Sequence, residues 1–292
     1  MDHHPDHASV VWLGDPGSLD PASVGPKAAH LGALATSHAV PPGFCVTAHA
    51  YRTERHDGRP TEALRAAVVA AYERLAHDDP QGGYVAVRSS AVDEDGAEAS
   101  FAGQHDTVLN VRGGESVLAA VTATWASLRS ETALAYRRER GLDEDGLALA
   151  VLVQRMVWAD AAGVAFSVDP ISGAEGTVVV TAAWGLGESV VAGTVTADTW
   201  RLDKDALGVL EASVAEKERM VIPSEDGTRE VAVPRFLRSR PALDDTQLRA
   251  VAEVTRTLER ERGWPVDVEF AWRDDRLALL QCRPVTRVGT HA

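Results

Sequence analysis

The stretch that most constrains the fold of this chain runs from Val266 to Thr286 and reads V-D-V-E-F-A-W-R-D-D-R-L-A-L-L-Q-C-R-P-V-T. Polar and apolar side chains alternate along 266–272 and again along 276–281, with R-D-D between the two runs. Successive side chains of a strand point to opposite faces, so an alternation of period two predicts strands rather than helices. A short polar turn between two such runs brings them back alongside each other. The sequence therefore predicts an antiparallel hairpin made of 266–272 and 276–281.

The rest of the sequence predicts a protein of mixed helices and strands. One helix is predicted to begin around Ser23–Pro26, because proline is tolerated at the first helical position. A strongly periodic helix follows Thr61, and a last helix begins near Asp244 and stops at Gly263. Helices are predicted at about 23–36, 61–77, 115–128, 131–140 and 244–262, and further strands at about 9–13, 44–47, 84–88, 149–155, 163–168, 177–182 and 197–202.

Composition excludes several classes of function. The chain has 292 residues, of which 45% are hydrophobic, so it can bury a sizeable core. Its net charge of −14 disfavours nucleic acids and anionic membranes as partners, because their phosphates repel an acidic protein. No apolar run approaches the roughly 20 residues of a membrane span. The N-terminal M-D-H-H-P-D-H lacks the apolar core of a signal peptide, so we expect a cytoplasmic protein.

Two cations stand at backbone positions that favour anions. Lys27 lies in the first turn of a predicted helix, and Arg88 ends a predicted strand just before Ser89-Ser90. The loop 89–106 that follows is rich in small hydrogen-bond donors, which suit a loop that closes over phosphates. Solvated cations and an ordinary surface loop explain the same residues, so both interpretations stay open here.

The predicted hairpin carries the sharper chemical signal. Asp267 and Glu269 share one face of its first strand, and Gln281 and Arg283 share one face of its second. Carboxylate, amide oxygen and guanidinium on adjacent strands are the groups that Mg²⁺ and a transferring phosphoryl group require. A plain solvent-facing surface accounts for this pattern equally well when the hairpin is considered alone.

Taken together, the motifs give a family resemblance. The chain resembles the N-terminal nucleotide-binding domain of the pyruvate phosphate dikinase and phosphoenolpyruvate synthase family, a domain that rifampin phosphotransferase also uses. The resemblance runs from about Val24 to Thr286 and rests on short strings that stand in family order. They are V-G-P-K-A-A-H-L-G-A-L, V-P-P-G-F, V-A-V-R-S-S-A, E-A-S-F-A-G-Q, V-Q-R-M-V, A-F-S-V-D-P, W-G-L-G-E and L-L-Q-C-R-P-V-T.

The resemblance implies an α+β ATP-grasp fold in which two subdomains clasp ATP between them. We expect an N-terminal subdomain at 9–148 with the phosphate-binding cations and the lid loop. A C-terminal subdomain at 149–287 should carry the adenine-binding strand and a Mg²⁺-binding hairpin. Residues 1–8 and 288–292 are expected to be tails.

The resemblance also implies roles for individual residues, with ATP and Mg²⁺ as the bound groups. The residues expected to contact ATP are Lys27 and Arg88 at the phosphates, Ser100, Gly103 and Gln104 in the lid, Gln154, Met156 and Val157 at adenine, and Glu188 near the nucleotide. Those expected to hold Mg²⁺ are Glu269 and Gln281. Arg283, Lys27 and Arg88 are expected to act on the transferring phosphoryl group, and His105 is a candidate general base. A strand-entry residue bonded to backbone is the competing interpretation of His105.

The resemblance also settles how His38 is interpreted. T-S-H-A around His38 has the letters that surround the family's phosphate-carrying histidine, but that histidine lies in a separate swivelling domain. Here the letters directly precede V-P-P-G-F, so we expect an ordinary surface histidine at His38.

The sequence therefore predicts a stand-alone ATP-dependent phosphotransferase that acts on an unidentified small-molecule acceptor. Three alternatives remain open. The chain could be the ATP-binding subunit of a split dikinase whose phosphohistidine domain lies on another protein, with AMP rather than ADP as the product. It could be a ligase that forms an acyl phosphate, or a nucleotide-binding module without turnover.

Overall fold

The structure is a computed structural model that describes residues 8–56, 59–91, 107–128, 130–131, 148–225 and 227–285. The described residues fall into two compact units. The first contains the residues up to Met156 together with 225 and 227, and the second contains 157–224 and the residues from Thr228 onward. Among the described helices, none is both long and apolar enough to cross a membrane.

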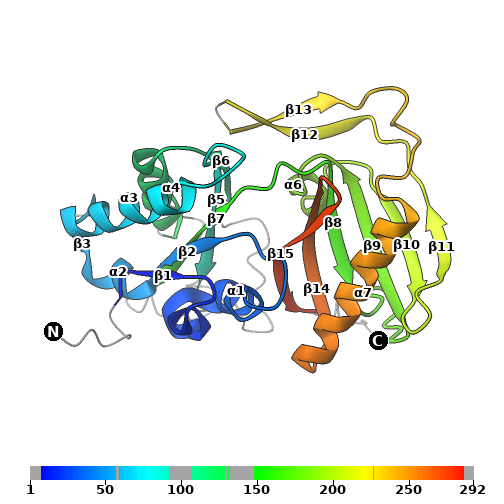
Figure 1. Ribbon diagram of the computed structural model, residues 1–292, viewed down its shortest axis with the longest axis horizontal. Coiled ribbons are helices and arrows are strands. Elements are labelled where there is room, and N and C mark those ends of the chain that lie inside the picture. The colour runs from blue at the N-terminus through cyan, green and yellow to red at the C-terminus, as the bar shows by residue number, and fades with distance from the viewer. Residues whose placement is uncertain are drawn as a thin grey trace. The chain divides into compact units, whose positions relative to one another are not determined.

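The first unit is built on a five-stranded antiparallel sheet in the order β1-β2-β7-β5-β6 (Figure 1). Its strands are β1 (Val10–Trp12), β2 (Gly43–Val46), β5 (Val85–Ala91), β6 (Val108–Val111) and β7 (Leu149–Arg155), with a short pair β3 (Arg55–His56) and β4 (Arg59–Pro60) outside the sheet. Its helices are a 3-10 turn η2 (Pro16–Leu19), α1 (Pro21–Leu34), α2 (Ala48–Thr53), α3 (Glu62–Ala76) and α4 (Gly114–Ser127).

Helices cover both faces of this sheet. The larger apolar cluster packs α3 and α4 on one face, where Leu64 and Trp125 are buried against Val153. The other cluster packs α1 on the opposite face, where Leu31 meets Cys45 and Leu152. Figure 1 shows α1 on the opposite side of the sheet from α3 and α4. This two-sided cover explains why the central strand β7 is apolar along almost its whole length.

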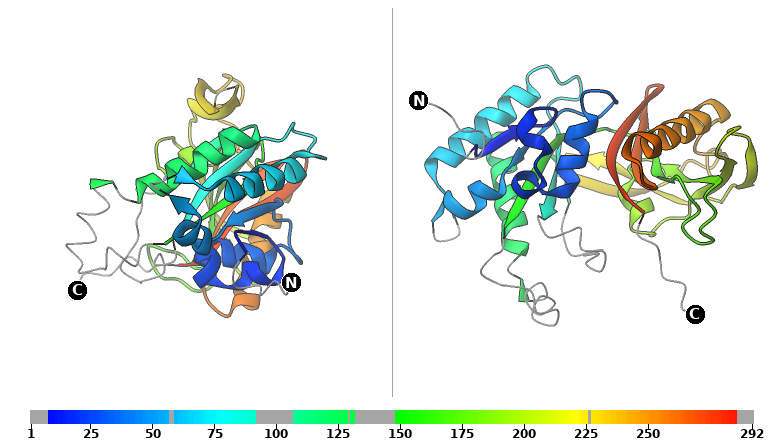
Figure 2. Two further views of the ribbon diagram at one scale, coloured as in Figure 1. Left: turned by 90° about the vertical axis from the view of Figure 1, so that its left-hand side faces the viewer. Right: turned by 90° about the horizontal axis from the view of Figure 1, so that it is seen from below.

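The second unit is built on a six-stranded antiparallel sheet in the order β11-β10-β9-β8-β14-β15. Its strands are β8 (Ala161–Phe166), β9 (Thr177–Trp184), β10 (Asp198–Asp203), β11 (Val209–Ser213), β14 (Val266–Arg273) and β15 (Arg276–Pro284). Two further strands, β12 (Arg219–Ser224) and β13 (Gly227–Ala232), form a separate hairpin (Figures 1 and 2). The helices are α6 (Glu188–Val191) and α7 (Asp245–Arg262).

One face of the second sheet is covered by α7. The Asp244 side chain accepts a hydrogen bond from the Gln247 amide, and the Gln247 side chain accepts one from the Asp244 amide, so the helix begins with a capping box. It ends at Gly263, whose φ of 75° terminates the helix in the left-handed conformation. Leu248 and Val251 on its buried stripe pack against the strands.

The predicted α+β class is confirmed by two antiparallel sheets with helices packed on them. The resemblance implied a second subdomain that begins at Leu149, whereas the first compact unit ends at Met156. Strand β7 pairs with β2 on one side and with β5 on the other, so it belongs to the first sheet. The first unit therefore continues to Met156, because backbone pairing outweighs the change of composition at Leu149.

Candidate functional site

In the first unit, α1 is interrupted at Gly25 and begins again at Pro26. Gly25 has φ 75° and ψ 156°, and a Cβ at this position would lie 2.3 Å from the carbonyl and hydroxyl oxygens of Ser90. The Ser90 hydroxyl accepts a hydrogen bond of 3.2 Å from the Ala28 amide. A residue from β5 thus caps the restarted helix in the way that a local N-cap residue would. This contact fixes the start of the helix against the end of β5.

The same contact brings two predicted cations to one region of the first unit. The Lys27 ammonium group donates to the Ser89 carbonyl at 3.3 Å. Arg88 is paired with Leu152 across the sheet, and Leu152 packs in the cluster on the α1 face. Because directly paired residues share a face, the Arg88 side chain also leaves the sheet on the α1 side. Lys27 and Arg88 are both half-buried, so they are partly shielded from solvent screening.

Gln154 lies on the same face as Arg88. It is two residues beyond Leu152 on β7, and it pairs with Ala86 and with Gly43. Its side chain is 1% exposed and donates to the Pro41 carbonyl at 3.2 Å. Met156, just after the strand, is buried and its amide donates to the Tyr84 carbonyl. The Met156 amide is therefore used within the first unit.

Val157 opens the second unit, and its carbonyl accepts from the Ala159 amide. The resemblance expected the backbone from Gln154 to Val157 to pair with adenine. Because the Met156 amide already donates to Tyr84, it cannot also donate to adenine. This segment therefore has one backbone donor fewer for a purine than the resemblance implied. The contact of these residues with adenine stays a prediction.

In the second unit, the predicted polar face of the closing hairpin is present. Glu269 is paired with Gln281, and Asp267 is paired with Arg283. Phe270 and Trp272 of the same strand pack in the cluster under α7. By strand alternation, Asp267 and Glu269 therefore point to the face of the sheet opposite α7. Their cross-strand partners share that face.

Asp267 holds Arg283 in place. The Arg283 guanidinium donates to the Asp267 carboxylate at 2.8 Å, and the arginine side chain is 53% exposed while Asp267 is 6% exposed. Burial raises the pKa of the Asp267 carboxyl, although the Arg283 charge opposes the rise and the Glu269 charge adds to it. The Arg283 Nε is held by a buried carboxylate while about half of the side chain is exposed to solvent. The guanidinium group is thus oriented to bind an anion.

The donor set suits a magnesium ion that is held mainly by its substrate. Among the described residues there is no group of three or more His, Cys, Asp or Glu side chains placed to hold a metal. Magnesium is commonly bound through one or two protein oxygens, with water and phosphate oxygens completing its octahedron. Glu269 and Gln281, adjacent on paired strands, supply that many. These residues therefore fit a nucleotide-bound Mg²⁺ and do not fit a dedicated protein cage.

The remaining predicted residues separate into two groups. Glu188 lies exposed at the start of α6, and its carboxylate is 3.5 Å from the Thr228 hydroxyl. The turn before it needs glycine, because Gly185 has φ 81° and a Cβ would lie 2.3 Å from the Val221 carbonyl. The predicted lid residues and general base lie outside the described residues. They are Ser100, Gly103, Gln104 and His105.

Two residues, one in each unit, support candidate site residues without having been assigned a role from the sequence. Ser90 caps α1 from a neighbouring strand, and Asp267 anchors Arg283. The signal for Asp267 was present, since it shares a strand face with Glu269. The role of Ser90 depends on a contact between residues 62 positions apart, which no local pattern encodes.

Comparison with known proteins identifies the family of this chain. The family described as pyruvate phosphate dikinase, AMP/ATP-binding domain, matches residues 56–292. A probable phosphoenolpyruvate synthase of Methanocaldococcus jannaschii is 36% identical over 95% of this chain, which covers 26% of that protein.

Two further relatives are named as transferases. The prodigiosin synthesizing transferase PigC of Serratia marcescens is 39% identical over 95% of this chain, which covers 33% of that protein. A rifampicin phosphotransferase of Streptomyces sviceus is 36% identical over 91% of this chain, which covers 34% of that protein. The chain thus spans about a quarter to a third of the length of these relatives.

Proposed function

We propose that this chain, which belongs to the pyruvate phosphate dikinase AMP/ATP-binding domain family, binds Mg²⁺-ATP and transfers a phosphoryl group from it to a small-molecule acceptor. The observation that carries the proposal is the register of the closing hairpin. It pairs Glu269 with Gln281 and Asp267 with Arg283 on the sheet face that α7 leaves uncovered. The relatives named as transferases support a direct transfer to an acceptor.

In the first unit, we assign the phosphates to Lys27 and Arg88. Phosphoryl transfer depends mostly on positioning and on neutralising charge, so two half-buried cations on one face supply what the chemistry requires. The carbonyl of Ser89 and the cap from Ser90 fix the helix that carries Lys27. We assign the purine to Gln154, Met156 and Val157.

In the second unit, we assign Mg²⁺ to Glu269 and Gln281. When bound there, Mg²⁺ would neutralise charge on the phosphate oxygens. Arg283, oriented by Asp267, would contact the transferring phosphoryl group. We propose that Glu188 lies near the nucleotide. Ser100, Gly103 and Gln104 are proposed to cover the phosphates. His105 is proposed to accept a proton from the acceptor molecule. A cytoplasmic location is proposed because ATP is the donor and because Cys45 and Cys282 are free thiols.

The first test identifies the phosphorus-containing products. The protein is incubated with Mg²⁺-ATP and candidate acceptors, and the reaction is followed by phosphorus NMR. ADP together with a new phosphorus signal on the acceptor supports direct transfer, and the chemical shift distinguishes P–O from P–N and acyl phosphate products. ATP binding without turnover in any mixture would refute the proposal and favour a binding module.

The second candidate function is the ATP-binding part of a split dikinase. The similarity to two probable phosphoenolpyruvate synthases, of which this chain covers 26% and 46%, favours it. AMP that forms only after addition of a second protein carrying a swivelling histidine domain would identify this alternative.

The role of the hairpin is tested with a matched pair of variants. Glu269→Gln removes a proposed metal ligand and should lower turnover by about 100-fold or more, because a positioned metal contributes several kcal/mol to the transition state. Glu175→Gln removes the same charge from an exposed loop of the second unit and should leave turnover unchanged. Equal turnover of the parent and Glu269→Gln would show that the metal assignment is wrong.

A further inference from the structure

A second concave site lies in the second unit, on the α7 side of its sheet. It is a cavity of about 750 Å³. Strand β10, the starts of β8 and α7, and the ends of β9 and β14 line it. The segment just before α7 completes the wall. The side chains that line the cavity include the indoles of Trp184, Trp200 and Trp272 and a set of aspartate carboxylates. From this combination of aromatic rings and carboxylates, we propose that the cavity binds a small organic cation, of the alkylammonium class.

Three tryptophans form the apolar part of the cavity wall. Trp200 and Trp272 are 4% and 8% exposed, and Trp184 is half-buried. The Trp184 indole N–H donates to the Leu237 carbonyl at 3.1 Å. The Trp272 indole nitrogen is buried and has no hydrogen-bond partner. A buried donor left without a partner is uncommon, and only an acceptor atom, such as the hydroxyl oxygen of an amino alcohol or of water, could satisfy it.

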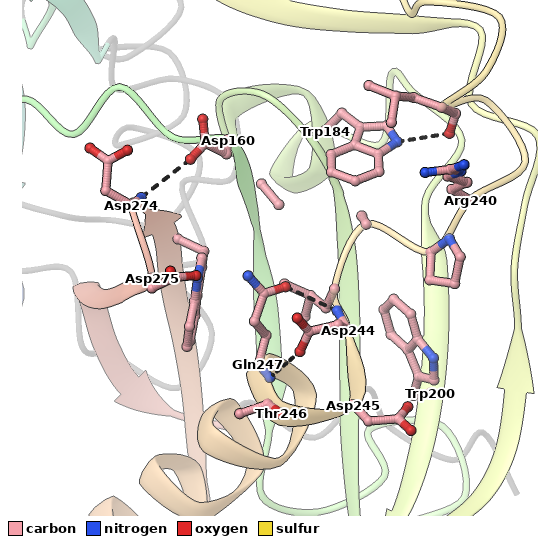
Figure 3. A pocket seen from close by; sticks show the side chains of 16 residues that line it. Asp160, Trp184, Trp200, Arg240, Asp244, Asp245, Thr246, Gln247, Asp274 and Asp275 are labelled. Carbon is pink, nitrogen blue, oxygen red and sulfur yellow. Dashed lines mark hydrogen bonds between the residues drawn. The ribbon is translucent and has the colours of Figure 1, made fainter.

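Carboxylates form the polar part of the wall. Five aspartates and one arginine line the cavity, which leaves four net negative charges in the lining. Figure 3 shows the Asp274 and Asp275 side chains on the left of the cavity, with Trp184, Trp200 and Arg240 on the right. An anion is therefore repelled and a cation attracted.

Some of these carboxylates already have partners. Asp244 caps α7, and Asp160 accepts hydrogen bonds from Arg273 and from the Asp274 amide. Asp245 and Asp275 are exposed, and within the described part of the chain neither side-chain carboxylate makes a hydrogen bond or ion pair. These two carboxylates remain to balance the charge of a ligand.

The mixture of groups selects an alkylated cation over a metal ion. The aspartates are too dispersed to make a cluster of three metal ligands anywhere in the described residues. Indole faces attract ammonium and guanidinium groups, and the apolar surface of an alkylated cation is desolvated more readily than a hydrated metal ion. Tryptophan walls with carboxylates at the rim are thus suited to a cation that carries methyl or methylene groups.

Within the second unit, this cavity lies on the face of the sheet opposite the residues proposed to hold Mg²⁺. Trp272 lies on the α7 face of β14, whereas Glu269, three residues earlier, lies on the opposite face. The proposal therefore goes beyond the phosphotransfer reaction and does not depend on it. Loss of ATP turnover would leave cation binding unchanged, so the two proposals can fail independently.

The experiment uses choline and its uncharged carbon analogue, 3,3-dimethylbutan-1-ol. The two molecules have the same shape, and only choline carries a charge. Three of the seven tryptophans line the cavity, so intrinsic fluorescence reports a ligand that contacts them. We expect choline to change the fluorescence saturably and to bind at least about tenfold more tightly than the alcohol. Added salt should weaken binding of choline.

The carboxylates are tested with a double variant and a matched control. Asp245→Asn with Asp275→Asn removes the two unpaired charges, and we expect choline to bind about three- to tenfold more weakly. Glu73→Gln with Asp78→Asn removes two exposed charges from the first unit and should leave binding as in the parent. Thermal unfolding of both double variants checks that they are folded.

Four results would overturn the proposal. The first is equal binding of choline and the uncharged alcohol, and the second is choline binding without a change in tryptophan fluorescence. The third is a folded Asp245→Asn, Asp275→Asn variant that binds choline as tightly as the parent does. Absence of saturable choline binding to the parent also contradicts it.

Discussion

Asp198 and Lys217 form an ion pair that is fully buried in the second unit, with both side chains 0% exposed. One carboxylate oxygen of Asp198 accepts from the Lys217 ammonium group at 2.6 Å and from the Ala215 amide at 2.8 Å. The other oxygen accepts from the Ala242 amide at 2.7 Å. The pair thus joins β10 to two loop segments, one of which lines the tryptophan cavity. We predict that Lys217→Met destabilises the second unit severely.

The magnitude follows from the burial of both partners. Removing Lys217 leaves a charged carboxylate without its counter-ion in the interior, which costs about 3–5 kcal/mol in comparable buried pairs. That is a large part of the roughly 5–15 kcal/mol by which a domain is stable. Asp198→Asn should cost a similar amount, because the buried Lys217 ammonium group would lose its counter-ion and keep only neutral acceptors such as the Ala215 carbonyl. The double variant should cost less than the two single changes added together.

The assay is urea unfolding followed by tryptophan fluorescence. Five of the seven tryptophans lie in the second unit, so this signal mainly reports the unit that contains the pair. Far-ultraviolet circular dichroism, which reports both units, serves as the comparison and shows whether the units unfold separately. A cost below about 1 kcal/mol for Lys217→Met, or a double variant that costs the full sum of the single changes, would refute the reasoning.

Three further predictions follow from single sites. Asp169 is buried, which by itself raises its pKa, but hydrogen bonds from following amides and a guanidinium lower it to about 2 from a normal value of 3.8. Its stabilising contribution is present above the normal value and is lost as the pH falls through about 2. As the pH falls, the free energy of unfolding of the parent should therefore decrease by up to about 2 kcal/mol more than that of Asp169→Asn. A difference between the two proteins that does not change with pH would contradict this. Gly25→Ala places a Cβ 2.3 Å from Ser90 in a left-handed conformation, so it should cost at least about 1–2 kcal/mol and weaken ATP binding. An unchanged melting temperature would be inconsistent with that contact. Burial raises the thiol pKa of Cys45, and raises that of Cys282 to about 12, so neither thiol should react with a disulfide reagent at pH 8 until the protein unfolds. Rapid labelling of the native protein would contradict their burial.

Strongly periodic and well-capped elements could be predicted from the sequence. The helix expected at 244–262 is α7 at Asp245–Arg262, because its capping box and terminal glycine are local signals. The strand expected at 149–155 is β7, and the closing segment forms the predicted antiparallel hairpin.

Elements without a strong local pattern could not be predicted. Strands β11, β12 and β13 are polar and mostly exposed, so hydrophobic alternation does not mark them. The short helix α2 is capped by the Thr47 hydroxyl but has too few residues for a periodic signal. The pairing partners of β7 depend on contacts far apart in sequence, so no local pattern shows that the first compact unit continues to Met156.

The sequence identified the residues proposed to bind ATP and Mg²⁺. It did not identify the residues that hold them in position. Arg88 and Glu269 stand on strands in recognisable motifs, and their faces follow from alternation once the register is known. The Ser90 cap and the unpartnered Trp272 indole arise only from tertiary packing.

Calorimetric titration with ATP tests the central claim most directly. In the presence of Mg²⁺, the parent should bind one ATP per chain. Lys27→Ala and Arg88→Ala should each bind about tenfold or more weakly, since each removes a cation from a partly shielded phosphate contact. Arg52→Ala, which removes an exposed cation from α2, should bind as the parent does. Affinities for Lys27→Ala and Arg88→Ala that equal the parent value would contradict the account.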